Sequence, residues 1–200
     1  MVAPSGYDSP CGDCLLAPDH ALLKDGLGFI AADLLRERCV CILLDRIATG
    51  DCSEPQELAR AVDFLQRDLP LHLADEQEDL FPLMRRCCLP EDEIDRVISR
   101  LLLDHQQAGE SAPEVLCVLA KVLQSAPLTL EAQQLLARFT SFARRHLILE
   151  TAVILPIARL RLRDSDHQSL RLRMMQRRGL DTKTTWPHRR PSQAPPAGKR

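Results

Sequence analysis

Apolar residues recur at helical spacing along four long stretches of the chain. In the first, residues 27–48, they fall three, four or seven positions apart, and the pattern stops at Thr-Gly-Asp. Similar stripes occupy the stretches that follow, with short connections rich in Pro, Gly or Ser between them: 53–83, 94–122 and 129–157. Long amphipathic helices joined by short connections predict an all-α fold, an up-down-up-down four-helix bundle.

Local signals refine the ends of these helices. Ser53 and Thr129 stand where a side-chain oxygen would cap the second and the fourth helix. Pro70 lies inside the second helical stretch, where its missing N–H would free a backbone carbonyl and bend the helix.

The flanking segments differ in composition from the bundle. Residues 1–26 are rich in Pro, Gly, Asp and Cys and predict a poorly ordered leader, so the bundle itself is expected over 27–160. Within 161–180 we expect a short C-terminal helix that packs Leu170 and Met174. Residues 181–200 are basic and Pro-rich, which predicts a disordered tail.

The second and fourth helices share a phrase. HLADEQEDLFPLM begins at His72 and HLILETAVILPIA begins 74 residues later, at His146. His and Glu four positions apart lie on one face of a helix, so His72 with Glu76, and His146 with Glu150, can reach toward one point. A single such pair is usually a surface ion pair, but two copies favour two halves of a metal site.

Counting through the turns brings a third histidine to the same level. A turn near residue 89 places residues 72–76 beside about 102–106, where His105 lies, and the next turn returns to about 149. Burying these five residues costs several kcal/mol unless they pair with one another or bind a metal. His and Glu without Cys favour iron or manganese, with zinc second.

The repeated phrase, its LFP sequence, and the lone His of the third helix resemble the hemerythrin-like (HHE cation-binding) family over about residues 27–160. The resemblance implies a four-helix bundle with a non-haem di-iron centre that binds oxygen or related small molecules. It also implies ligand roles: Glu76 and Glu150 as bridging carboxylates, His72 on one iron, and His105 with His146 on the other.

Two positions depart from the family pattern. Leu34 stands where the resemblance places a histidine of the first helix, and Gly109 stands where family members carry another histidine on the third. His20 is too far along the chain to replace the first. Candidate substitutes are Asp33, Glu37 and Glu110, although each is ordinarily a solvated helix charge. Five ligands predict either two irons with open positions or one metal in a two-His, one-carboxylate site.

Charge and composition exclude several partners. The net charge of −2 hides an acidic body, since residues 1–176 carry 19 Lys and Arg against 27 Asp and Glu. With one Tyr and one Trp, such a body does not predict nucleic-acid binding. No run of about 18 apolar residues and no export signal appears, so we expect no membrane contact and a cytoplasmic protein. Its eight cysteines are then reduced thiols, with Cys11 and Cys14 as a labile surface pair.

The sequence thus predicts an iron protein that senses, binds or reacts with oxygen, nitric oxide or peroxide, with a small diatomic molecule as its partner. The alternative is a degenerate, metal-free bundle that acts as an interaction module, motivated by Leu34 and Gly109. A di-iron oxidase or peroxidase is a third interpretation. Because no substrate pocket, catalytic triad or phosphate-binding loop is visible, enzyme activity is not predicted.

Overall fold

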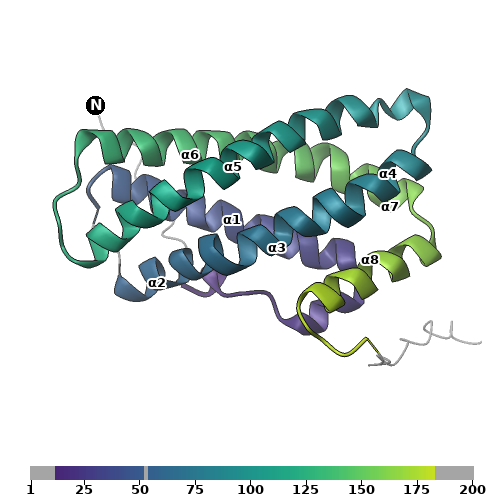
Figure 1. Cartoon of the computed structure of the whole chain (residues 1–200), viewed down its shortest axis with the longest axis horizontal. Helices are drawn as coiled ribbons and strands as arrows, with labels where there is room; N and C mark the ends of the chain where they lie inside the picture. Colours follow the sequence, from purple (N-terminus) through teal and green to yellow (C-terminus); the bar gives the residue numbers. More distant parts are fainter. Residues whose placement is uncertain (1–11, 52–53, 183–200) are drawn as a thin grey trace, which may run out of the picture.

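The computed structural model describes residues 12–51 and 54–182, and these residues form helices and connections without any strand (Figure 1). This confirms the predicted all-helical class. The 3₁₀ helices are η1 (Gly12–Leu15), η2 (His20–Lys24) and η5 (Pro90–Asp92). The remaining elements are α1 (Gly26–Ala48), α2 (Pro55–Asp63), η3 (Phe64–Asp68), α3 (Leu69–Ala74), η4 (Asp75–Leu80), α4 (Phe81–Cys87), α5 (Ile94–Leu123), α6 (Leu130–Leu149), η6 (Glu150–Ile154), α7 (Leu155–Arg161) and α8 (Asp164–Arg177).

Two of the long helical rods contain π-helical segments, and proline explains all three of them. The second rod runs from α2 to α4 through η3 and η4, and another runs from α6 to α7 through η6. Proline lacks an N–H and its ring crowds the carbonyl four residues earlier, so the helix widens before it. The residue before each proline donates its N–H five residues back instead of four: Leu69 to Phe64, Phe81 to Glu76, and Leu155 to Glu150. The distortion expected at Pro70 is therefore a π segment.

The rods pack side by side, with α8 added across one end. α1 lies along α6, α5 lies along α6, and α2 and α4 contact α5 (Figure 1). α8 contacts η4 and α1, and it buries Leu170 and Met174. An added Cβ at Gly26, the first residue of α1, would lie only 3.2 Å from the Met174 sulfur, so glycine allows this close approach. The described chain thus has a fifth helix beside the four rods.

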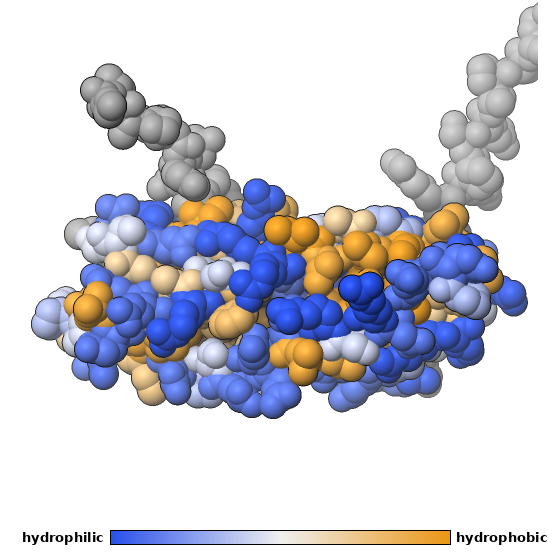
Figure 2. Space-filling model, turned by 90° about the horizontal axis from the view of Figure 1, so that it is seen from above, coloured by the Kyte–Doolittle hydropathy of each residue, from blue (hydrophilic) through white to orange (hydrophobic). Residues whose placement is uncertain are grey.

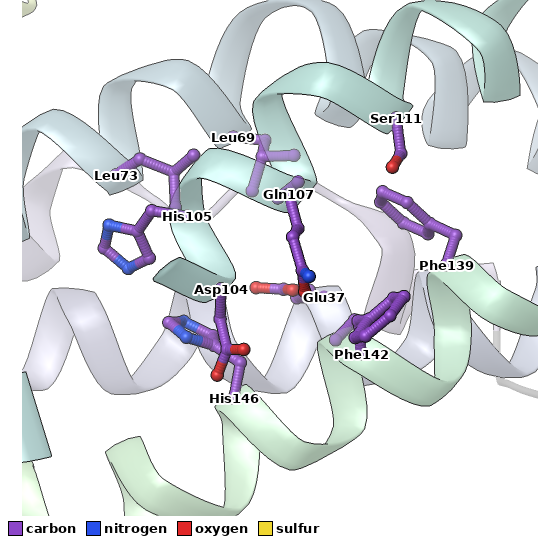
Figure 3. Close-up of a pocket in the computed structure, with 12 residues that line it drawn as sticks. Glu37, Leu69, Leu73, Asp104, His105, Gln107, Ser111, Phe139, Phe142 and His146 are labelled. Carbon is purple, nitrogen blue, oxygen red and sulfur yellow. The ribbon is translucent and has the colours of Figure 1, made fainter. Parts of the chain in front are cut away.

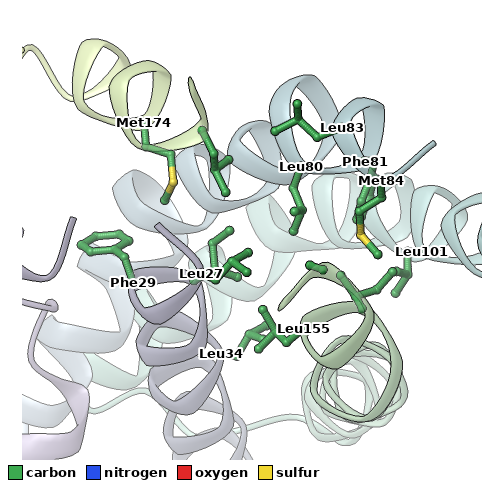
Figure 4. Packing of buried hydrophobic residues seen from close by; sticks show 14 of the residues in the cluster. Leu27, Phe29, Leu34, Leu80, Phe81, Leu83, Met84, Leu101, Leu155 and Met174 are labelled. Carbon is green, nitrogen blue, oxygen red and sulfur yellow. The ribbon is translucent and has the colours of Figure 1, made fainter. Parts of the chain in front are cut away.

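Buried apolar side chains form two clusters. One includes Leu27, Leu34, Leu80, Leu155 and Met174 (Figure 4), and the other includes residues nearer the opposite ends of the same rods, among them Leu43, Phe64, Val115 and Leu136. Along the first three rods, the buried residues Glu37, His72, Glu76 and His105 fall in sequence near the boundary between the two clusters, whereas His146 and Glu150 lie among residues of the first cluster. The core is therefore apolar on both sides of a polar layer.

The connecting and terminal segments also bear on the predictions. Residues 12–25 of the expected leader contain η1 and η2 and bury Leu15 and Leu23, so this part packs on the bundle. Thr129 caps α6 by accepting from the Ala132 N–H. α2 begins at Pro55 with Glu54 at the cap position, while Ser53 lies outside the described residues, as do 1–11 and 183–200. The predictions for Cys11 and for most of the basic tail fall on those residues.

The outer surface is mixed. On the face seen in Figure 2 hydrophilic side chains predominate, and apolar side chains gather on one half of it. Leu35, Ile148 and Leu160 are among the exposed large apolar residues. Within residues 12–51 and 54–182, no helix has the length and apolar character needed to cross a membrane.

Candidate metal centre

The structure brings the five sequence-predicted residues together in the buried layer. Glu76 is fully buried, and three imidazoles surround its carboxylate. Nε2 of His72 lies 3.4 Å from Oε1 of Glu76, and Nε2 of His105 lies 3.1 Å from its Oε2. Nε2 of His146 lies 4.0 Å from the same Oε2. Three of the predicted side chains, all imidazoles, therefore converge on the Glu76 carboxylate from three different rods.

Glu150, the fifth, is also fully buried, and it lies close enough to Glu76 for each carboxyl to affect the pKa of the other. Burial raises the pKa of both carboxyls well above the usual range, and the proximity of the Glu76 carboxyl raises that of Glu150 further. Each glutamate lies at the start of a π segment, Glu76 as the second residue of η4 and Glu150 as the first of η6, and its carbonyl accepts the N–H from five residues on. The Pro inside each copy of the repeated phrase, six residues after the glutamate, thus fixes the helix geometry at that glutamate.

α1 adds two carboxylates, Asp33 and Glu37, which the sequence suggested only as substitutes for the missing histidine ligands. Ligand-type atoms of Glu37, His72 and His146 lie within 4.8 Å of one another, as do those of Glu76, His105 and His146. Asp33 is also buried, and its Oδ2 lies 4.0 Å from Nδ1 of His72. A sequence signal for Glu37 exists, because it lies three residues after Leu34 and four before Cys41, on the apolar stripe of α1.

The other candidates lie away from the cluster. Glu110 is exposed on α5 and accepts a hydrogen bond from Gln106. Leu34 belongs to the apolar core, and a Cβ added at Gly109 would have no atom within 4 Å. His20 is exposed in η2, and His167 lies on α8. Asp33 and Glu37 are therefore the only proposed substitutes that the structure places at the layer.

Burial makes the whole cluster favour neutral side chains. It lowers the pKa of His72 to about 3 and that of His105 to about 4, and it holds the pKa of His146 well below its usual value. The same loss of hydration raises the pKa of Glu37 to about 8. For Asp33, burial raises the pKa to about 7 against the opposing charge of Arg178. Without a cation, the low-dielectric layer disfavours each charged form.

The donor atoms of this layer fit a metal ion. Among the described residues, six contribute ten of the ring nitrogens and carboxylate oxygens that are buried without a hydrogen-bond partner: Glu37, His72, Glu76, His105, His146 and Glu150. Each such atom costs roughly 1–3 kcal/mol, which a bound cation would offset. Nitrogen and oxygen donors without sulfur suit iron or manganese.

Two neighbouring side chains, Gln77 and Phe81, orient one of the imidazoles. Nε2 of Gln77 lies 2.8 Å from Nδ1 of His105, which leaves Nε2 of that ring toward Glu76. The Phe81 ring stacks on the other side at a centroid distance of 5.6 Å. Such outer contacts fix the ring orientation of a metal-binding histidine.

A small cavity reaches the cluster between α3, α5 and α6. Its volume is about 20 Å³, and Glu37, His105 and His146 line its inner end (Figure 3). Apolar side chains line much of the remainder, namely those of Leu69, Leu73, Phe139, Phe142 and Ala143. A cavity of this size admits about one water-sized molecule.

The family model of the Hemerythrin HHE cation binding domain matches residues 18–158 of the chain. The chain belongs to this family. The match contains all six residues of the buried layer, and α8 lies beyond its end. No curated protein and no solved structure matches the sequence.

Arginines at the C-terminal end of α8 form ion pairs with η4, the segment that carries Glu76 of the hemerythrin-like site. Asp75 and Asp79 flank Glu76 on η4 and are buried. Arg177 binds both of them, at 2.8 Å for Asp79, and Arg178 binds Asp75 at 2.7 Å. The acidic run around the first HxxxE copy thus pairs with arginines that follow the family domain.

Proposed function

We propose that this hemerythrin-family chain is a non-haem iron protein that binds or reacts with a small molecule such as oxygen, nitric oxide or peroxide. The observation that carries the proposal is the buried layer itself, in which imidazoles and carboxylates from several helices converge without other partners. The family's cation-binding character supports the same conclusion. The four rods would be the family's bundle, and α8 an addition to it.

His72, Glu76, His105, His146 and Glu150 would hold one or two iron ions. Glu76 and Glu150 would both supply carboxylate oxygens, since all four of their side-chain oxygens are buried without a hydrogen-bond partner among the described residues. Bound iron supplies a redox-active centre with a free coordination position for a small ligand. The protein would control access to this centre. The small, largely apolar cavity would restrict which molecules reach His105 and His146, and it would keep bulk water out.

The proposed location is the cytoplasm, where the cysteines remain reduced. Within the described residues, Cys14, Cys39, Cys41, Cys87, Cys88 and Cys117 are free thiols. Because none of these six described cysteines belongs to either group of metal-ligand atoms in the layer, we assign them no part in metal binding.

Iron content tests the proposal. Protein produced with iron and purified anaerobically under reducing conditions should contain about one to two iron atoms per chain. The variant His72→Ala/Glu76→Ala should lose them, whereas His167→Ala, a histidine on α8, should retain them. A chelator should lower the melting temperature of the wild type, because removing a ligand of the native state removes its stabilisation.

A specific observation favours the second candidate, a metal-free interaction module: Leu34 packs in the apolar core where the resemblance places a histidine. The iron proposal would be refuted, and this module supported, if the purified wild-type protein contained no iron and if neither iron nor chelator changed its melting temperature.

A further inference from the structure

The helix α1 brings one acidic side chain to the centre of the buried layer. Glu37 is only 6% exposed, and its Oε2 has no hydrogen-bond partner among the described residues. Figure 3 shows Glu37 and His146 at the same cavity, from α1 and α6. The side chain therefore points into the layer, and a buried carboxylate oxygen there needs a cation or a donor.

The neighbouring cation on α1 is occupied elsewhere. Arg36 donates from Nε to the Leu15 carbonyl at 3.0 Å and pairs with Asp68. Its guanidinium also lies 5.1 Å from the centre of the Phe64 ring. Arg36 thus links η1 and η3 to α1, and its charge is paired with groups other than Glu37.

Two imidazoles lie close to the Glu37 carboxylate. Atoms of Glu37, His72 and His146 lie within 4.8 Å of one another, a two-His, one-carboxylate set from three helices. A second set of the same composition consists of Glu76, His105 and His146. Two-His, one-carboxylate sets bind iron with open positions.

We propose that Glu37 is the metal ligand contributed by α1, acting with His72 and His146. This inference rests on the proposed iron-binding function. It accounts for the core position of Leu34, because α1 then reaches the metal from Glu37, nearly one helical turn further along, and needs no histidine. It also makes the centre more anionic than one with an imidazole at that place.

The test compares Glu37→Gln with Glu110→Gln, a matched change at the exposed carboxylate of α5. Ferrous iron is titrated anaerobically into each metal-free protein against a competing chelator, and each protein is melted with and without iron. Glu37→Gln should bind iron at least about tenfold more weakly, since even outer-shell changes cost about 10–100-fold. Glu110→Gln should bind as the wild type does.

Melting temperatures measured without metal show whether Glu37 acts as a metal ligand or as a structural residue. Gln keeps the shape of Glu and carries no charge, so metal-free Glu37→Gln should melt at or above the wild-type temperature. The iron-loaded variant should melt below the loaded wild type. Equal destabilisation in both states would show that Glu37 is structural and would overturn the inference.

The remaining outcomes distinguish the two proposals. If wild type and Glu37→Gln bind iron equally well, the role of Glu37 is refuted while the iron function stands. If the wild type takes up no more iron than His72→Ala/Glu76→Ala, the iron function fails and the role of Glu37 fails with it.

Discussion

The contact between α8 and η4 gives a prediction that can be worked out from the structure. The Arg177 side chain is 17% exposed and binds three carboxylates of η4: Asp75, Asp79 at 2.8 Å and Glu78 at 2.9 Å. Arg177→Met keeps most of the apolar stem but removes the charge. Because Asp75 and Asp79 are almost fully buried, the change leaves buried negative charge with fewer partners.

Removing one partner of a buried ion pair typically costs about 3–5 kcal/mol. Arg178 still pairs with Asp75 at 2.7 Å and Arg173 with Asp79 at 3.2 Å, so we expect the lower end, about 3 kcal/mol. In a protein of this size 1 kcal/mol shifts the melting temperature by roughly 2–4 °C. Arg177→Met should therefore melt about 6–12 °C below the wild type.

Arg173→Met is the matched control, because Arg173 lies on the same helix and contacts the same Asp79 but is 61% exposed. An exposed pair contributes about 0–1 kcal/mol, so this variant should shift by at most about 4 °C. Melting is followed by circular dichroism in chelator and again with iron. Adding Asp75→Asn to Arg177→Met should restore part of the loss, since it removes a buried charge. Equal melting temperatures for the Arg177 and Arg173 variants would refute the reasoning.

Two further changes test the layer and its surroundings. The free energy of unfolding of the metal-free protein should fall as the pH rises from about 6.5 to 8. The raised pKa values of Asp33 (about 7) and Glu37 (about 8) mean that the folded state holds protons which the unfolded state has lost, at most about 1.4 kcal/mol per group and pH unit and less as the pH passes the folded pKa of each group. The contribution of these carboxyls to the free energy of unfolding is complete below about pH 4 and is lost as the pH rises through 7 to 8. The buried histidines have the opposite pH dependence, but only below their unfolded pKa of about 6.5, so they do not offset this loss at higher pH. Urea unfolding at both pH values measures it, and stability that rises toward pH 8 would contradict it. Leu34→Ala should cost about 2–5 kcal/mol of stability yet keep the iron content of the folded protein, and iron loss from the folded variant would show that Leu34 does more than pack.

Periodicity and spacing determined much of this protein. The helical stripes fixed the rods, because a helix must bury one apolar face. The two HxxxE pairs fixed which residues share a face, and the length of each helix set the level at which His105 meets them. The prolines inside the two phrases are local causes as well, since a missing N–H acts on its own helix whatever surrounds it. For these reasons all five predicted side chains meet in the structure.

Tertiary packing alone decided whether the charged side chains on α1 and at the end of α8 are buried, paired or exposed. Asp33 and Glu37 look like ordinary helix charges in the sequence, but α1 is covered by α6, α8, η1 and η2, so both are buried. Arg177 and Arg178 look like the start of a basic tail, but they pair with the acidic run beside Glu76. Whether a charged side chain is solvated, paired or aimed at a metal depends on which distant segment covers it, and helical periodicity carries no information about that.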